Sequence, residues 1–213
     1  MSVTPRVRAE VLRLVAVTDS LRGGIDGLAG RAAAAVAGGA TMLTLRLPDE
    51  SARTLAEAAR ALRAAAPTVP LLVSDRVDVA LAVEADGVHL GSSGLSAGCV
   101  RLFAPERLII GASVGSEDEV PHAAGADFVA IGPVFSSSIV AGRGESIGIE
   151  RFAELAAECQ LPAVAVGGVA PANAAALMAA GAAGVAVINA LLGADDPMHA
   201  ARVLRSALDA SGT

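Results

Sequence analysis

Short apolar runs rich in Val, Ile and Leu alternate along the chain with alanine-rich stretches whose apolar positions recur at helical spacing. This alternation is typical of repeated β-α units around a parallel sheet, whose strands are buried on both faces. The predicted strands cover residues 12–19, 41–47, 70–75, 87–90, 108–114, 128–135, 163–169 and 184–189. The predicted helices cover residues 27–37, 50–66, 76–85, 97–103, 116–124, 148–159, 171–180 and 197–210.

Helix-start chemistry supports two of these helices. Ser116 precedes three acidic residues, which suit the first turn of a helix, and Pro171 suits an opening position where its missing N–H costs nothing. Gly125 and Gly181 are expected to end helices before the next strand begins.

The number of β-α units decides the architecture. Eight units in 213 residues predict a compact (β/α)8 TIM barrel of the α/β class. A doubly wound sheet usually has fewer strands and a glycine-rich phosphate turn after the first one, and no such turn follows Asp19. We therefore expect one barrel domain over residues 1–213, with a short extra helix at 189–193.

Composition narrows the function classes. With 54% hydrophobic residues, a chain of this size buries about 70% of its unfolded surface and needs no disulfide or metal for its core. The net charge of −6, the lack of a basic cluster and the absence of Trp and Tyr argue against nucleic acid as a partner. No apolar run reaches the roughly 18 residues of a membrane span, and the first ten residues lack a signal-peptide core, so we expect a soluble cytoplasmic protein with no membrane partner. Cys99 and Cys159 lack metal-ligand spacing and are expected to be reduced, buried thiols.

Function in such a barrel lies at the carboxyl ends of the strands, which directs attention to the polar residues there. The clearest signal is the pair Gly167-Gly168 after the seventh predicted strand and Ile188-Asn189 after the eighth. Glycine lets backbone N–H groups approach an anion closely, so these positions predict phosphate binding. A tight turn needed only for packing is the alternative.

Three charged or titratable residues at other strand ends each have a structural alternative. Asp75 either holds Mg²⁺ near a phosphate or caps the helix that begins at Arg76. Arg46 needs an anionic partner, which is a substrate phosphate or else Asp19 or Asp75. His89 is an acid-base or substrate-contacting group or else a hydrogen-bonded core residue.

The longest loop follows the sixth predicted strand, at residues 136–146. Its Ser and Gly content suits a flap that closes over an anion, with Ser137, Ser138 and Arg143 as phosphate contacts. A flexible surface loop without such a role is the alternative.

The strand-end motifs, in their order along nearly the whole chain, resemble those of the thiamine phosphate synthase/TenI family of (β/α)8 proteins. The motifs are Val17-Thr18-Asp19, Leu45-Arg46, Ser74-Asp75-Arg76, Ala85-Asp86-Gly87-Val88-His89-Leu90-Gly91, Gly111-Ala112-Ser113-Val114, Ile131-Gly132-Pro133-Val134-Phe135, Val166-Gly167-Gly168-Val169 and Gly184-Val185-Ala186-Val187-Ile188.

The resemblance implies a thiamine-biosynthesis enzyme that binds a thiazole phosphate on the backbone of Gly167, Gly168, Ile188 and Asn189. A pyrimidine site is implied near Arg46, Ser74 and His89, with Ser113 beside them in the catalytic set. The synthase branch joins the two rings by displacing Mg²⁺-bound pyrophosphate from the pyrimidine methylene, whereas the TenI branch moves a proton to aromatise the thiazole and needs no metal.

The chain departs from the patterns of both branches. Pro48 stands where a synthase typically has Lys, Gly94 where it has a second metal-binding Asp, and Val140 at or next to the flap Lys. Loss of the two lysines weakens the stabilisation of pyrophosphate unless Arg143 replaces their charge. Gly115 stands where the TenI-type tautomerase usually has its His. Three readings stay open: a divergent synthase with Asp75 holding Mg²⁺, a TenI-like tautomerase using His89, and a phosphate-binding regulatory protein without catalysis. Homo-oligomer formation is also possible.

Overall fold

The computed structural model describes residues 7–136 and 146–210. Eight parallel strands form a closed barrel in the sequential order β1-β2-β3-β4-β5-β6-β7-β8. The strands are β1 (Leu14–Val17), β2 (Met42–Leu45), β3 (Leu71–Ser74), β4 (Gly87–Leu90), β5 (Ile109–Val114), β6 (Phe128–Ile131), β7 (Ala163–Val166) and β8 (Gly184–Val187). β8 pairs with β1 through Leu14 opposite Val185, which closes the ring and confirms the predicted (β/α)8 class.

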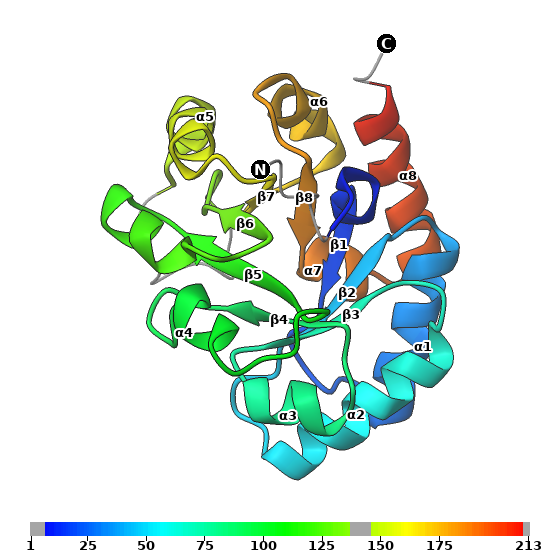
Figure 1. Ribbon diagram of the computed structural model, residues 1–213. Helices are drawn as coiled ribbons and strands as arrows, with labels where there is room; N and C mark the ends of the chain where they lie inside the picture. The colour runs from blue at the N-terminus through cyan, green and yellow to red at the C-terminus, as the bar shows by residue number, and fades with distance from the viewer. Residues whose placement is uncertain (1–6, 137–145, 211–213) are drawn as a thin grey trace.

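Helices surround the barrel (Figure 1). They are α1 (Gly24–Ala37), α2 (Ala52–Ala65), α3 (Val77–Ala82), α4 (Ala97–Arg101), α5 (Gly148–Cys159), α6 (Pro171–Ala179), α7 (Asn189–Leu192) and α8 (Pro197–Asp209), with 3-10 segments η1 (Ala9–Leu12) and η2 (Glu117–Ala123). The short helix after the eighth strand thus forms where it was predicted, as α7.

Two predicted elements differ from the structure. The α-helix predicted at 116–124 is the 3-10 segment η2, because Pro121 lies inside it and supplies no N–H for an α-helical hydrogen bond. The strand predicted from residue 12 begins at Leu14, since Leu12 belongs to η1. Most predicted strands also end earlier in the structure, and the residues beyond them line the carboxyl end of the barrel.

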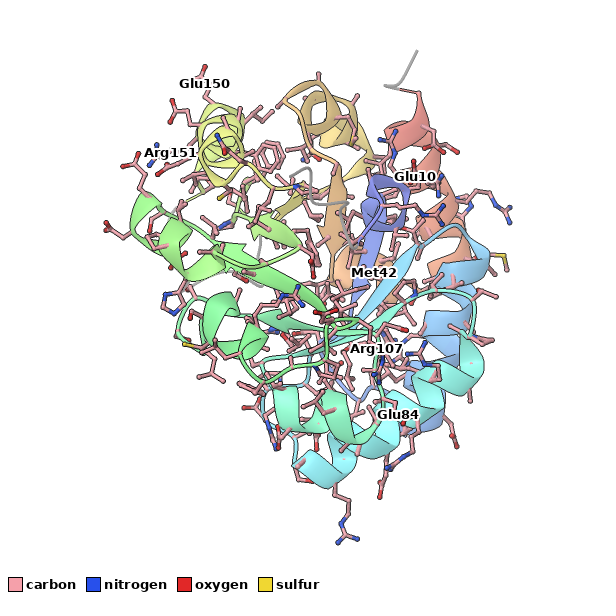
Figure 2. The ribbon with its side chains drawn as sticks, viewed as in Figure 1. Glu10, Met42, Glu84, Arg107, Glu150 and Arg151 are labelled. Carbon is pink, nitrogen blue, oxygen red and sulfur yellow. The ribbon has the colours of Figure 1, made fainter. Side chains whose placement is uncertain are left out.

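The core has two parts. The larger lies between the sheet and the surrounding helices and includes Phe152 and Leu204. The smaller fills the barrel itself with side chains such as Met42, Leu72 and Phe128. Met42 is fully buried, and Figure 2 labels it in the middle of the barrel, whereas the labelled Glu150 and Arg151 lie at the periphery. The interior is therefore packed, and the chemistry is confined to the barrel ends.

Two aspartates fasten the amino-terminal end of the barrel. Asp86 precedes β4 and accepts a hydrogen bond from Leu71 N at 2.8 Å, and Asp127 precedes β6 and accepts one from Ile110 N at 2.8 Å. Each also forms an ion pair, with Arg63 and Arg101 respectively. These groups lie at the end of the barrel that serves stability, opposite the end that carries function.

No helix among residues 7–136 and 146–210 is long and apolar enough to cross a membrane.

Candidate active site

The carboxyl ends of the strands bring most of the predicted site residues to one mouth of the barrel. Ser74 and His89 are direct register neighbours on β3 and β4, and His89 is in turn opposite Gly111 on β5. Ser113 lies two residues further along β5. Since side chains alternate along a strand, Gly111 and Ser113 share one face of the sheet with the His89 ring between them.

His89 is held by three neighbours. Its Nε2 lies 3.0 Å from Ser113 Oγ, and its ring centroid lies 5.8 Å from that of Phe128. A Cβ atom on Gly111 would lie 2.6 Å from His89 Nδ1 and 2.4 Å from the Phe128 ring, so only glycine leaves room for the imidazole there. Burial lowers the pKa of His89 to about 4, against a smaller opposing effect of Asp75. The imidazole is therefore neutral near pH 7.

Asp75 has an unusual backbone for a residue with a side chain. Its φ is 61°, in the left-handed region that costs most residues energy and that Asp and Asn tolerate best. Its backbone N–H donates to His89 O at 2.8 Å, and its Oδ1 accepts from Gly91 N at 2.7 Å. The carboxylate is exposed at the mouth, and the helix cap predicted as its alternative role is absent, because the residue before α3 is Arg76.

Arg46 is positioned by the end of β1. Thr18 Oγ1 accepts from Arg46 N at 2.8 Å and donates to Arg46 O at 2.9 Å. The Arg46 guanidinium forms a 3.2 Å ion pair with Asp19, with both side chains partly exposed. The structural alternative considered for Arg46 is thus present, and an incoming phosphate would have to compete with Asp19.

The glycine pair after β7 adopts a turn that other residues would strain. Gly167 and Gly168 have φ of 95° and 61°. A Cβ on Gly168 would lie 2.6 Å from Phe135 Cβ and 2.8 Å from Ser136 O, and one on Gly167 would lie 2.7 Å from Pro133. The turn packs against the segment leading into the loop after β6, so the two loops meet at this point.

Asn173 fastens this turn and was not among the predicted residues. Its Nδ2 donates to Gly168 O at 3.0 Å, and its Oδ1 accepts from Ala170 N at 2.9 Å. The sequence did offer a signal for it: Asn173 lies three residues after Ala170, which precedes α6. From this position a side chain can form a hydrogen bond to the backbone at the start of the helix. The carbonyl of Gly168 is therefore turned toward α6 and away from the loop after β6.

Ile188 and Asn189 follow β8, which lies between β7 and β1 in the ring. Ile188 precedes α7, and its carbonyl accepts from Leu192 N at 3.1 Å. Asn189 is the first residue of α7 and its carbonyl accepts from Gly193 N. The predicted phosphate residues thus occupy the two adjacent strand ends of β7 and β8.

Glu119, in η2 after β5, is a second residue that sequence reasoning missed. Glu119 Oε2 accepts a hydrogen bond from Gly115 N at 2.6 Å. A Cβ on Gly115 would lie 3.2 Å from Gly132 O and 3.4 Å from Glu119 Oε2. The space beside Gly115 is therefore occupied by Glu119 and the β6 backbone.

The residues that would hold Mg²⁺ are few. No cluster of three His, Cys, Asp or Glu side chains suited to a metal occurs in the described part of the chain. Asp75 offers one exposed carboxylate, and Gly94 lies nearby without a side chain of its own. Mg²⁺ in proteins is often held by one or two carboxylates, with substrate phosphates and water completing its shell. Asp75 fits that mode, in which pyrophosphate would supply further oxygens.

Three predicted contacts, Ser137, Ser138 and Arg143, lie outside the described residues. Of the two cysteines expected to be buried, Cys99 is exposed and Cys159 is half-buried, and both are free thiols. The prediction for Cys99 was wrong because α4 is a short surface helix with few buried positions.

Comparison with known proteins places this geometry in a family. The family model described as thiamine monophosphate synthase matches residues 14–191, which include every predicted site residue. The chain belongs to the thiamine monophosphate synthase family. The predicted resemblance is thereby confirmed, as is the expectation that the chain is an enzyme.

Individual relatives agree with the family match. A thiamine-phosphate synthase from Azorhizobium caulinodans is 42% identical over 204 residues, covering 94% of this chain and 96% of that protein. One from Moorella thermoacetica is 44% identical over 176 residues, covering 80% and 83%. A solved thiamine phosphate pyrophosphorylase from Pyrococcus furiosus superposes with a TM-score of 0.85 at 34% identity, covering 96% of this chain and 99% of that one.

Proposed function

We propose that this member of the thiamine monophosphate synthase family couples thiazole phosphate to hydroxymethylpyrimidine pyrophosphate. The bond from the pyrimidine methylene carbon to the pyrophosphate oxygen breaks, pyrophosphate leaves with the electron pair, and the thiazole nitrogen bonds to the methylene carbon. The relatives named thiamine-phosphate synthase, at 42–44% identity, support this reaction class.

Asp75 is the observation that carries the proposal. Backbone strain in a residue with an exposed charged side chain is typical of functional sites, where the surrounding structure maintains it. Asp75 shows such strain at φ 61°, and Gly91 N holds its carboxylate at the mouth of the barrel. When bound there, Mg²⁺ would stabilise the negative charge of the departing pyrophosphate. Proton transfer within a thiazole would not need such a carboxylate.

The other residues have roles that follow from their positions. The turn at Gly167 and Gly168, together with Ile188 and Asn189, binds the thiazole phosphate, since a glycine turn lets backbone N–H groups approach an anion closely. Arg46 leaves Asp19 to bind pyrophosphate. Among the predicted contacts outside the described residues, Ser137 and Ser138 bind phosphate and Arg143 replaces the family's flap Lys.

His89, Ser113 and Ser74 contact the pyrimidine. Because the pKa of His89 is about 4, its ring is a neutral hydrogen-bonding group and not a cation for pyrophosphate. Its contact with Ser113 fixes the ring's orientation for substrate. Ser74 lies beside His89 on the neighbouring strand.

A TenI-like tautomerase is the second candidate, favoured by the His89 and Ser113 pair. A neutral imidazole in contact with a hydroxyl can accept and return a proton. Against it, Gly115 carries no side chain at the position where the tautomerase has its His, and Glu119 and Gly132 crowd that position. In this reading the enzyme would act on thiazole carboxylate phosphate alone.

One NMR experiment separates these readings. The protein is incubated in one sample with thiazole phosphate and hydroxymethylpyrimidine pyrophosphate, with and without Mg²⁺, and in a second sample with thiazole carboxylate phosphate alone. We expect coupling above the uncatalysed background that requires Mg²⁺ and stops with EDTA. Aromatisation without coupling would replace the synthase proposal with the tautomerase, and neither reaction would indicate a binding protein without catalysis.

The matched variants are Asp75→Asn and Asp78→Asn. Asp78 lies three residues away on α3 and pairs with Arg76 at the surface. Asp75→Asn should reduce coupling at least 100-fold, as expected for loss of a charged group that stabilises the transition state, and Asp78→Asn should leave it within twofold. Equal activity of both variants would contradict the role given to Asp75.

A further inference from the structure

A pocket with about 300 Å³ of space, part of it open to solvent, lies between the end of β1, helix α1 and helix α7. The polar residues in its wall are Asp19, Ser20, Arg22, Arg31 and Asn189. No residue of β7 lines it, so it is separate from the Gly167 and Gly168 turn, although Ile188 and Asn189 border both.

Arg31 is the unusual residue of this pocket. Its Nε is buried and has no hydrogen-bond partner, a condition found at no other buried side-chain nitrogen or oxygen in residues 7–136 and 146–210. Buried donors in folded proteins are nearly always paired with protein, water or ligand, because an unpaired one loses its hydration without compensation. The free N–H of Arg31 therefore requires a partner that is not part of the described chain.

The Arg31 guanidinium lies beside two glycines at the start of α1. A Cβ on Gly27 would lie 3.4 Å from Arg31 Nη1, and one on Gly23 would lie 3.6 Å from it. The guanidinium thus packs against the start of its own helix, where side chains are missing.

The charges around the pocket favour an anion. Asp19, the acidic residue in the wall, already pairs with Arg46. Neither Arg22 nor Arg31 forms an ion pair within the described ranges. Asp26 in the first turn of α1 is exposed and does not line the pocket. Two guanidinium groups therefore remain without a countercharge there.

We propose that this pocket is a second anion site, in which Arg31 Nε–H donates to a phosphate oxygen. A guanidinium presents donors in a planar fork that matches phosphate, and charge-assisted bonds of this kind are among the strongest in proteins. Arg22 at the pocket edge adds charge without burial. The site goes beyond the proposed reaction: it borders the thiazole phosphate site at Ile188 and Asn189, but its anion is held from the α1 side by Arg31 and Arg22.

The experiment follows the Arg31 Nε–H resonance in ¹⁵N-labelled full-length protein during titration with inorganic phosphate. The resonance is assigned by its loss in Arg31→Lys, which keeps the charge but has no such N–H. Chloride at equal ionic strength is the control for general screening, and pyrophosphate tests whether a larger phosphate is also accepted. The backbone N–H of Gly168 reports separately on the β7 site.

A saturable shift of the Arg31 resonance with phosphate and not with chloride is expected. Arg22→Met should weaken phosphate binding about two- to fivefold, as fits a partly screened surface charge, and Arg60→Met on the exposed face of α2 should not change it. A resonance that stays fixed while phosphate is added would show that water is the partner of Arg31 and would overturn the proposal. Since no thiazole or pyrimidine is present, failure of the coupling reaction does not affect this result.

Discussion

His89 Nε2 and Ser113 Oγ lie 3.0 Å apart across two neighbouring strands, in the space that Gly111 leaves open. The contact joins a neutral imidazole to a hydroxyl at the carboxyl end of the barrel. The contact between His89 and Ser113 therefore requires glycine at position 111.

Removal of the Ser113 hydroxyl should reduce coupling about tenfold, because one hydrogen bond that orients His89 is lost. The loss should appear mainly in KM for the pyrimidine substrate if His89 serves binding. Ser116→Ala is the control, since Ser116 is exposed and its side chain caps no helix N–H. Steady-state kinetics of both variants check the prediction, and equal KM values would contradict it.

The unfolding free energy should fall as the pH falls from about 6.5 to 4. Unfolded histidine has a pKa near 6.5, whereas the pKa of folded His89 is about 4, so the unfolded chain takes up a proton first. The loss is complete below pH 4 and amounts to at most about 3 kcal/mol for this group. Urea unfolding in metal-free buffer gives the unfolding free energy at each pH. This free energy should depend less steeply on pH in His89→Asn than in the unmodified protein, and equal dependence would contradict the lowered pKa of His89.

Although activity requires the carboxylate, the stability of the fold should tolerate Asn at position 75 better than Ala. Asn keeps an oxygen for Gly91 N and adopts positive φ readily, while Ala loses the hydrogen bond and bears the strain of φ 61°. We expect Asp75→Ala to lower the unfolding free energy by about 2 kcal/mol relative to Asp75→Asn. Denaturant titration of the two variants measures the difference, which should vanish if the backbone relaxes.

Asn173→Ala should loosen the turn after β7. Two hydrogen bonds are lost, to Gly168 O and from Ala170 N, at a cost of about 1–2 kcal/mol in stability. Affinity for thiazole phosphate should fall about fivefold, since a turn that is not held in place must be ordered on binding. Asn173→Asp keeps the acceptor for Ala170 N and loses the donor to Gly168 O. Calorimetric titration of both variants shows which bond matters, and unchanged affinity in both would separate the turn from the phosphate.

Asp127→Asn should destabilise the protein strongly without touching the site. It leaves the largely buried Arg101 without its countercharge, at a cost of about 3 kcal/mol. Glu154→Gln, which breaks an exposed pair with Arg151, should cost less than about 1 kcal/mol. Thermal unfolding compares the melting temperatures of the two variants. A similar decrease in both would mean that Arg101 finds another partner.

Much of the fold was predictable because each β-α unit repeats the same local pattern. The 3-10 segment at Glu117–Ala123 was not, because one internal proline outweighed a favourable first turn. The site residues on strand ends were found because a parallel barrel brings such ends together. The contact of His89 with Ser113 depends on the strand register, which residue types do not reveal. Glu119 and Asn173 act through hydrogen bonds to the backbone, and their residue types do not reveal these bonds either. The unpaired Nε of Arg31 depends on how α1 packs, which one helical position does not show.

The aspartates at the other end of the barrel bear on how such a protein changes over generations. Asp86 and Asp127 link neighbouring strands by hydrogen bonds at the end of the barrel opposite the mouth. Replacement of residues at the mouth therefore leaves these hydrogen bonds intact. A lineage can exchange a lysine for Pro48 or an aspartate for Gly94 and still inherit a folded barrel on which selection for a new ligand can act. The residues that determine activity and the residues that maintain the fold thus lie at opposite ends of the same barrel, so the first can change while the second stay the same.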